Sequence, residues 1–247
     1  MDYETVWNWF CRFSLIVFIL ICINSILGDI IFRAQYSFPK VTETTDNIIN
    51  VKNEPEQTDI KNSEMLKVYG EKNKYVLEPQ AQYSISGLVV AKNSNFWFRD
   101  IMRSTFDDVC LIDFGIVWGD LATDKNRLYK HVKFKSTKTL GQARSLNWRT
   151  KPPYNEVPWD IEYLSTHLAH THMIPANSNI MSALLKIKKN DYVKLDGYLV
   201  DIYKDSDGQI VAKTSLSRYD NNATSRGYGA CEDMYVKSVQ IGNKIYR

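Results

Sequence analysis

Residues Asp108–Gly119 read DVCLIDFGIVWG, and this stretch predicts the centre of the fold. Side chains alternate between the two sides of a β-strand. The first side would carry Cys110, Ile112, Phe114, Ile116 and Trp118, and the second Val109, Leu111, Gly115 and Val117. Both sides are mainly apolar, so the stretch is typical of a strand inside a sheet that is covered on both faces. Asp113 is its odd polar member.

Further strands are predicted around this one. The same alternation or β-rich composition marks three stretches, namely YSISGLVVAK at 83–92, YVKLDGYLVDIY at 192–203 and the final run at 232–241. Asp205–Gly208 reads DSDG, a hairpin signal from which 209–217 would return. The clearest helix is 179–187. The sequence therefore predicts a mainly β domain, a small antiparallel barrel or sandwich with one or two short helices.

An apolar stretch, Phe10–Phe32, stands near the N-terminus. About 20 apolar residues span a bilayer core, and Trp7–Gly28 reaches that length if Arg12 extends toward the head groups. We expect an uncleaved membrane anchor over 1–32. A cleaved signal peptide is one alternative, although Gly28 as the last removed residue leaves a large residue, Ile26, two positions earlier. A buried helix of a soluble fold is the other alternative.

Orientation and organisation follow from this anchor. Arg12 precedes the apolar core, and Arg33 and Lys40 follow it, so the positive-inside rule gives almost no signal. We expect a single-pass protein of the inner or cytoplasmic membrane, with the domain facing the periplasm or exterior. Residues 33–80 are polar and are predicted to form a flexible tether, and 81–247 the folded domain.

The charge of the domain is mildly positive. Residues 81–247 carry 23 Lys and Arg against 17 Asp and Glu. This excess permits attraction to an anionic surface but lacks the dense basic runs with interleaved aromatics of nucleic-acid-binding proteins. We therefore expect the membrane and an envelope protein or polymer as partners, and no nucleic acid.

Two of the four cysteines, Cys110 and Cys231, lie in the predicted domain. If the domain lies outside the cytoplasm, a disulfide between them is expected. The alternatives are two separate buried thiols, or Cys231 as a nucleophile with His131 or His170 as its base.

Three of the four histidines, His167, His170 and His172, lie within six residues. Imidazoles are preferred ligands for Zn and Cu, and an extended segment would direct His170 and His172 to one side. A third ligand could come from His167 or from His131, Asp160 or Glu162, and Glu162 or Glu232 could serve a catalytic zinc as base. The spacing matches no established metallohydrolase motif, so structural histidines are the alternative.

The aromatic triplet Phe96, Trp97 and Phe98 is a further candidate site. These side chains could form an exposed binding patch or pin a loop into the core.

The segments YSISGLVV, DVCLIDFGIVWGD, KIKKNDYVKLDGYLV and GACEDMYV together resemble a domain of uncharacterised, membrane-anchored bacterial proteins. The resemblance covers 81–247 and implies no known activity. The KNDYV start of the strand near residue 190 is also loosely similar to small β-barrels of OB or SH3-like type. Because the sequence contains no catalytic motif of high specificity, we expect a non-catalytic binding or assembly module. A metal-dependent hydrolase or metal-binding protein, or a thiol-active protein, is the alternative.

Overall fold

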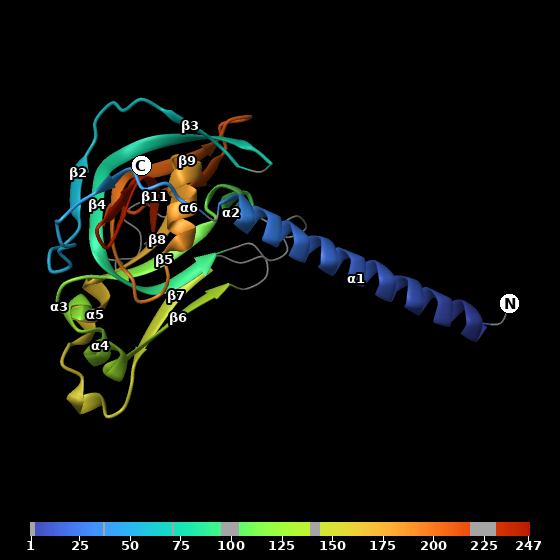
Figure 1. The fold of residues 1–247 in the computed structure, drawn as a ribbon, viewed down its shortest axis with the longest axis horizontal. Helices are drawn as coiled ribbons and strands as arrows, with labels where there is room; N and C mark the ends of the chain where they lie inside the picture. Colours follow the sequence, from blue (N-terminus) through green and yellow to red (C-terminus); the bar gives the residue numbers. More distant parts are fainter. Residues whose placement is uncertain (1–2, 37, 71, 95–103, 139–143, 218–230) are drawn as a thin grey trace.

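The computed structural model describes residues 3–36, 38–70, 72–94, 104–138, 144–217 and 231–247. A long helix, α1 (Tyr3–Gln35), projects from a β-rich domain (Figure 1). Its apolar part, Val6–Gly28, is not buried by the rest of the chain. A helix of this length and composition fits either a membrane span or a signal sequence.

The domain is built mainly of strands. These are β1 (Glu43–Thr44), β2 (Glu56–Asp59), β3 (Leu66–Tyr69), β4 (Lys74–Ser94), β5 (Ile112–Val117), β6 (Val132–Lys138), β7 (Arg144–Thr150), β8 (Leu168–Pro175), β9 (Tyr192–Lys204), β10 (Ile210–Ala212), β11 (Glu232–Ile241) and β12 (Lys244–Tyr246). The helices are α2 (Thr105–Val109), α3 (Asp120–Thr123), α4 (Lys125–His131), α5 (Ile161–Thr166) and α6 (Ser178–Lys186), with a 3-10 turn at Tyr154–Glu156. The prediction of a mainly β domain is confirmed, and the described short helices are more numerous than the one or two that were expected.

Five strands pair in a closed order. β4 pairs with β5, β5 with β8, β8 with β11, β11 with β9, and β9 with β4. All of these pairs are antiparallel except β8–β11, which is parallel. The sheet is therefore large and mixed, with one parallel pair in the mainly antiparallel arrangement that the sequence predicted. The reason is the odd number of strands: five strands in a closed order cannot alternate in direction throughout, so one pair has to be parallel.

The main core is formed by side chains from these five strands and from α6. It includes Ile112 and Phe114 of β5, Leu195 of β9 and Met234 of β11, each at most 1% exposed. Figure 1 shows α6 lying across these strands. The predicted helix at 179–187 is confirmed by α6, in which Asn177 caps the N-terminus by accepting from the amide of Ile180.

The long strand expected over 108–119 is shorter than predicted. β5 begins at Ile112, because residues Thr105–Val109 form the helix α2 instead. Ser104 caps this helix, and the buried carboxylate of Asp108 accepts hydrogen bonds from the amide of Asn73 and the hydroxyl of Tyr75. These bonds favour a turn at Asp108 over an extended strand.

The polar stretch 33–80 was expected to be a flexible tether, and the structure corrects this. β1 pairs with β12, both β2 and β3 pair with β4, and β4 itself begins at Lys74. β2 has the sequence EQTD and is mostly exposed, so backbone pairing at the edge of β4 holds it rather than apolar burial. Composition alone does not report such pairing.

A separate two-stranded sheet, β6 with β7, is called the β6–β7 ribbon below. Its inner side packs through Phe134, Leu146 and Trp148 against a second apolar cluster that includes Val117 of β5. Gly115 makes this approach possible. A Cβ atom on Gly115 would lie 2.6 Å from Cδ2 of Leu146.

Candidate metal centre

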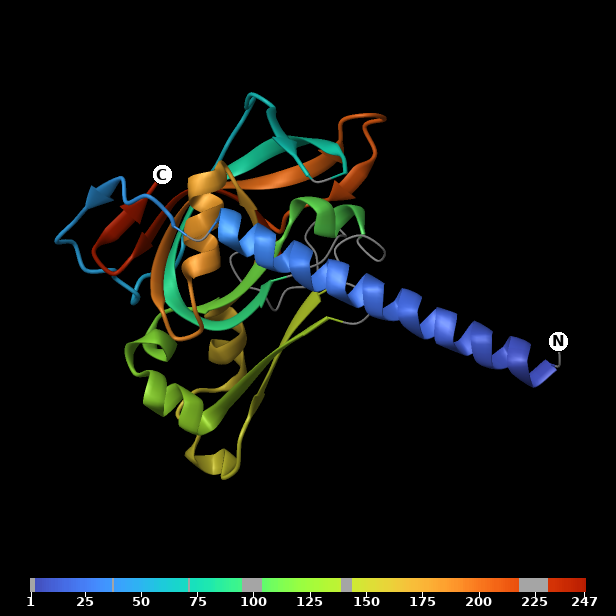
Figure 2. The ribbon, with the colours of Figure 1, turned by 45° about the vertical axis from the view of Figure 1, so that its right-hand side comes forward.

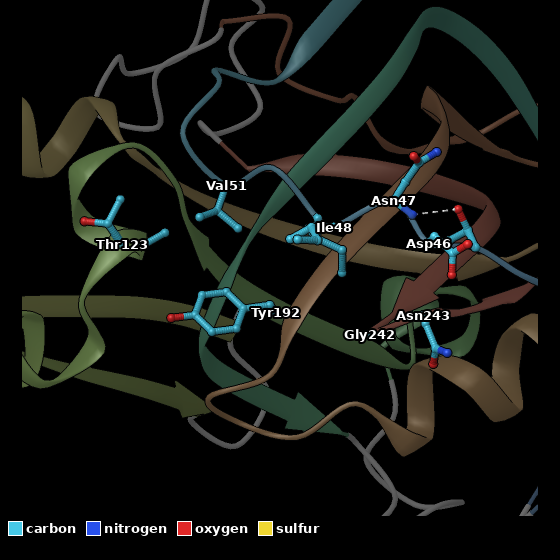
Figure 3. Close-up of a pocket in the computed structure, with 11 residues that line it drawn as sticks. Asp46, Asn47, Ile48, Val51, Thr123, Tyr192, Gly242 and Asn243 are labelled. Atoms are coloured by element: carbon cyan, nitrogen blue, oxygen red, sulfur yellow. Dashed lines mark hydrogen bonds between the residues drawn. The ribbon is translucent and has the colours of Figure 1, made fainter.

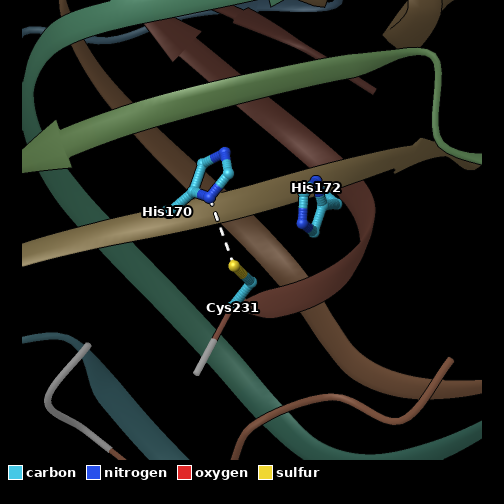
Figure 4. Close-up of side chains that lie close together, drawn as sticks. All are labelled: His170, His172 and Cys231. Carbon is cyan, nitrogen blue, oxygen red and sulfur yellow. Dashed lines mark hydrogen bonds between the residues drawn. The ribbon is translucent and has the colours of Figure 1, made fainter. Parts of the chain in front are cut away.

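Two histidines and one cysteine converge beside β8. His170 and His172 stand two residues apart on this strand and extend to the same side, and Cys231 reaches them from the start of β11 (Figure 4). Ligand atoms of the three residues all lie within 4.8 Å of one another. The Sγ of Cys231 is 3.2 Å from Nδ1 of His170. The predicted shared side of His170 and His172 is therefore present, with a thiol as the third donor.

The register of three strands brings these groups together. His170 is opposite Gly115 of β5, and His172 is opposite Asp113 of β5 and Asp233 of β11. Partners in register direct their side chains to the same face of a sheet, so this face carries donor groups from all three strands. Neighbouring residues on the opposite face, such as Phe114, belong to the main core.

A buried carboxylate orients one of the imidazoles. His172 donates from Nδ1 to Oδ1 of Asp113 across 2.7 Å, and both side chains are almost completely buried. The bond fixes the tautomer of His172 and leaves Nε2 as its lone-pair nitrogen. Metal-ligating histidines usually donate their second nitrogen to a carboxylate in this way. The edge of Phe106 packs on the same ring, with centroids 4.8 Å apart.

No disulfide joins Cys110 to Cys231 in the described structure, which corrects that expectation. The register explains why. Cys231 precedes the partner of Thr171 and is therefore level with His170 and Gly115. From Gly115 to the start of β5 at Ile112 is already about 10 Å along the strand, and Cys110 lies two residues further, at the end of α2. A disulfide needs Cα atoms about 4.4–6.8 Å apart. Cys110 instead packs in an apolar cluster at the end of α2.

His167 does not join the other two histidines, although the sequence grouped all three. It ends α5, and its ring stacks on Tyr163 with centroids 3.7 Å apart. Its Nδ1 lies 3.0 Å from the carbonyl oxygen of Tyr163. The chain turns from helix to strand directly after His167, and this turn sends the side chain away from His170.

The other proposed ligands and bases also lie elsewhere. His131 ends α4 and meets the edge of Trp159. Asp160 caps α5 by accepting from the amide of Tyr163, and Glu162 is exposed on that helix. Glu232 is buried near Thr171, whose hydroxyl donates to it across 3.4 Å. It follows Cys231 directly, so strand alternation directs it to the opposite face from the cluster. The aromatic candidates Phe96, Trp97 and Phe98 lie outside the described residues.

A cavity of about 530 Å³ lies apart from this cluster, between the stretch 45–51, α3 and the β11–β12 turn (Figure 3). Ile48, Val51 and Tyr192 give it an apolar wall, and Asp46 and Asn243 give it polar groups. Among the described residues that line it there is no His or Cys, so it offers hydrogen bonds but no soft metal ligand.

Sequence reasoning missed Asp113 as a partner of His172. The available signal was a charged residue at the centre of an otherwise apolar strand, because a buried carboxylate needs a partner. It considered Cys231 as a disulfide partner, a buried thiol or a nucleophile, but not as a metal ligand. Comparisons with protein-family models, with curated proteins and with solved structures found no match to this chain.

Proposed function

We propose that this protein is a membrane-anchored binding module whose ligand is a soft transition-metal ion, held by His170, His172 and Cys231. The observation that carries the proposal is the convergence of three donor atoms within 4.8 Å, supported by the bond from His172 to Asp113. Zn²⁺ fits two imidazoles and one thiolate, whereas Mg²⁺ and Ca²⁺ prefer oxygen ligands.

The strand order supports a binding role for this face. We propose that β4, β5, β8, β9 and β11 form an OB-like barrel, with β4 as its first strand and α6 between its third and fourth. The closed pairing order and the parallel pairing of β8 with β11 support this assignment. OB barrels use the face of their second and third strands to bind oligonucleotides and oligosaccharides. Here those strands would be β5 and β8, which carry Asp113, His170 and His172.

Binding is favoured over hydrolysis at this centre. A catalytic zinc site needs three protein ligands, an open position for water and a general base. Neither Glu162 nor Glu232 faces the cluster, and Asp113 is engaged by His172. Neither of the two expected bases therefore lies at this centre, and the other carboxylate of this face, Asp233, is buried beside the register position of His172.

Thiol chemistry is the second candidate function, favoured by the 3.2 Å approach of Cys231 to His170. An adjacent imidazole can take the proton of a thiol and stabilise the thiolate, which is the nucleophilic form. In that case Cys231 would react with electrophiles, and zinc would not be needed for the fold of the site.

The anchor is proposed from α1. Its apolar stretch Val6–Gly28 is not covered by the domain, which supports a span through lipid rather than a core helix. We propose that α1 is retained, with its N-terminus inside and the domain outside the membrane. The intact mass of the protein purified from the membrane fraction tests this. A mass that includes residues 1–28 supports an anchor, and a mass without them identifies a signal peptide.

Zinc content combined with cysteine labelling tests the metal proposal. The full chain, purified from membranes, should carry one zinc, and zinc should protect Cys231 from maleimide. His170→Ala should lose both properties, whereas the control His167→Ala should retain them. A chain without zinc in which Cys231 reacts rapidly, whether or not zinc is added, would support the thiol function instead.

A further inference from the structure

The β6–β7 ribbon concentrates positive charge in a part of the chain that has no acidic residues. Between Lys125 and Asn155 the sequence contains no Asp or Glu. The two strands and the residue after them carry Lys133, Lys135, Lys138, Arg144, Arg149 and Lys151. The domain as a whole is only mildly positive, but this part of it is strongly positive.

The two sides of the ribbon differ in chemistry. Phe134, Leu146 and Trp148 face the domain and pack against its second apolar cluster. Lys133, Lys135 and Arg149 alternate with them and are exposed. Within the described residues, no ion pair neutralises these three cations. Lys151 is different, because its ammonium group donates to the carbonyl oxygen of Tyr129. Lys130 pairs with Glu156 across 3.7 Å.

Two of the exposed cations oppose each other. Lys133 and Arg149 are direct partners in the ladder between β6 and β7. Like charges at opposed positions of an antiparallel pair are destabilising. An anionic ligand that contacts both side chains would relieve this repulsion, so the arrangement favours a ligand that is extended and negatively charged.

The position of α1 bears on the source of that negative charge. In Figures 1 and 2, the end of the ribbon at which β6 finishes and β7 begins points to the side from which α1 leaves the domain. Of the three exposed cations, Lys135 lies nearer to this end, whereas Lys133 and Arg149 lie near the other end of the ribbon. Tyr36, directly after α1, packs against the main core and so joins the helix closely to the domain. The apolar window ends at Gly28, so only about 10 Å of helix separates it from Gln35.

We propose that the outer face of the β6–β7 ribbon, defined by Lys133, Lys135 and Arg149, contacts the anionic head groups of the membrane in which α1 is anchored. The inference rests on the proposed anchor and is independent of the metal centre. Each basic residue near an anionic surface strengthens the contact by about fivefold. The three together should strengthen it by about 100-fold, and salt should weaken it.

Hydrogen exchange of the full chain in lipid nanodiscs tests the proposal. Discs of phosphatidylcholine are compared with discs that also contain phosphatidylglycerol. We expect the amides of β6 and β7 to exchange at least fivefold more slowly in the anionic discs at low salt, and this difference to vanish at high salt. Equal exchange in both discs at low salt would overturn the proposal.

A pair of triple variants identifies the residues responsible. Lys133→Gln, Lys135→Gln and Arg149→Gln together should abolish the lipid effect and leave exchange in neutral discs unchanged. The control combines Lys52→Gln, Lys61→Gln and Lys244→Gln, which remove the same charge from exposed positions elsewhere and should retain the effect.

Two further outcomes separate the possible failures. In one outcome, an oligonucleotide added to neutral discs slows exchange of the β6 and β7 amides, and phosphatidylglycerol has no effect. The ribbon would then bind a soluble polyanion, and the lipid contact would be overturned. If the protein elutes apart from the discs, both the proposed anchor and the ribbon contact are overturned. If the purified protein carries no zinc but still shows the lipid effect, only the metal proposal is contradicted.

Discussion

His172 on β8 and Asp113 on β5 are register partners, and a hydrogen bond of 2.7 Å joins Nδ1 of the imidazole to Oδ1 of the carboxylate. The bond fixes which nitrogen of His172 carries the proton and which keeps its lone pair. Asp113→Asn keeps the size of the side chain but removes its charge and makes the ligand His172 less basic. We expect zinc affinity to fall about 10–100-fold, which competition with a chromogenic chelator measures. Asp160→Asn is the control, because Asp160 caps α5 away from the cluster. An unchanged affinity in Asp113→Asn would contradict a metal-orienting role for this carboxylate.

The donor set predicts an asymmetric response to histidine substitution. His170→Ala should remove zinc binding, because His170 contacts Cys231 directly. His167→Ala should leave binding intact and instead lower stability slightly, since its ring stacks on Tyr163. Zinc titration by calorimetry distinguishes the two variants. Equal losses in both would show that all three histidines act as one site, against the described geometry.

Gly197 tests the closed order of the five strands. It lies on β9, where it is the register partner of both Tyr83 of β4 and Val236 of β11. A Cβ atom there would lie 1.9 Å from the carbonyl oxygen of Tyr235, so Gly197→Ala requires a backbone shift between β9 and β11. We expect a loss of about 1–3 kcal/mol or more in the free energy of unfolding, measured with urea. Gly28→Ala in α1 meets no neighbouring atom and serves as the control; a loss of similar size there would argue against a local clash.

Because Tyr75 is buried and hydrogen-bonded, we expect the protein to lose stability at alkaline pH. Burial, and then the hydrogen bond it donates to Asp108, raise the pKa of Tyr75 well above its ordinary value. Burial also raises the pKa of Tyr129 to about 12. Above about pH 10 the unfolded chain loses these protons while the folded chain keeps them, so the free energy of unfolding should fall as pH rises.

Urea unfolding at a series of pH values measures this effect. Below pH 10 the contribution of these tyrosines should be constant, because both states keep the proton. Tyr75→Phe should reduce the slope above pH 10, and Tyr69→Phe, at an exposed position, should leave it unchanged. A slope that Tyr75→Phe does not alter would assign the alkaline loss to other groups.

Local signals in the sequence predicted much of the fold. Alternation predicted β11 with its observed bounds, the Asp-Gly pair predicted the turn after β9, and the capped apolar stripe predicted α6. These elements depend on neighbours within a few residues. β2 was missed because its polar residues are held by backbone pairing with β4, which residue composition does not encode.

The candidate site was predicted only in part, because local spacing predicts some of its residues and long-range strand pairing supplies the rest. A spacing of two residues on an extended segment was enough to place His170 and His172 on one side. Cys231 joins them from 61 residues away, through the parallel register of β8 with β11. That register depends on how the whole set of strands closes, so no local pattern could have chosen Cys231 over His167.

Cobalt titration of the full-length protein is the most direct test of the metal centre, because Co²⁺ takes zinc sites and reports its ligands by absorbance. We predict saturation at one equivalent, with tetrahedral bands and a thiolate charge-transfer band that is lost in Cys231→Ser and retained in Cys110→Ser. Absence of these bands at saturating cobalt, or their persistence in Cys231→Ser, would contradict the proposed site at His170, His172 and Cys231.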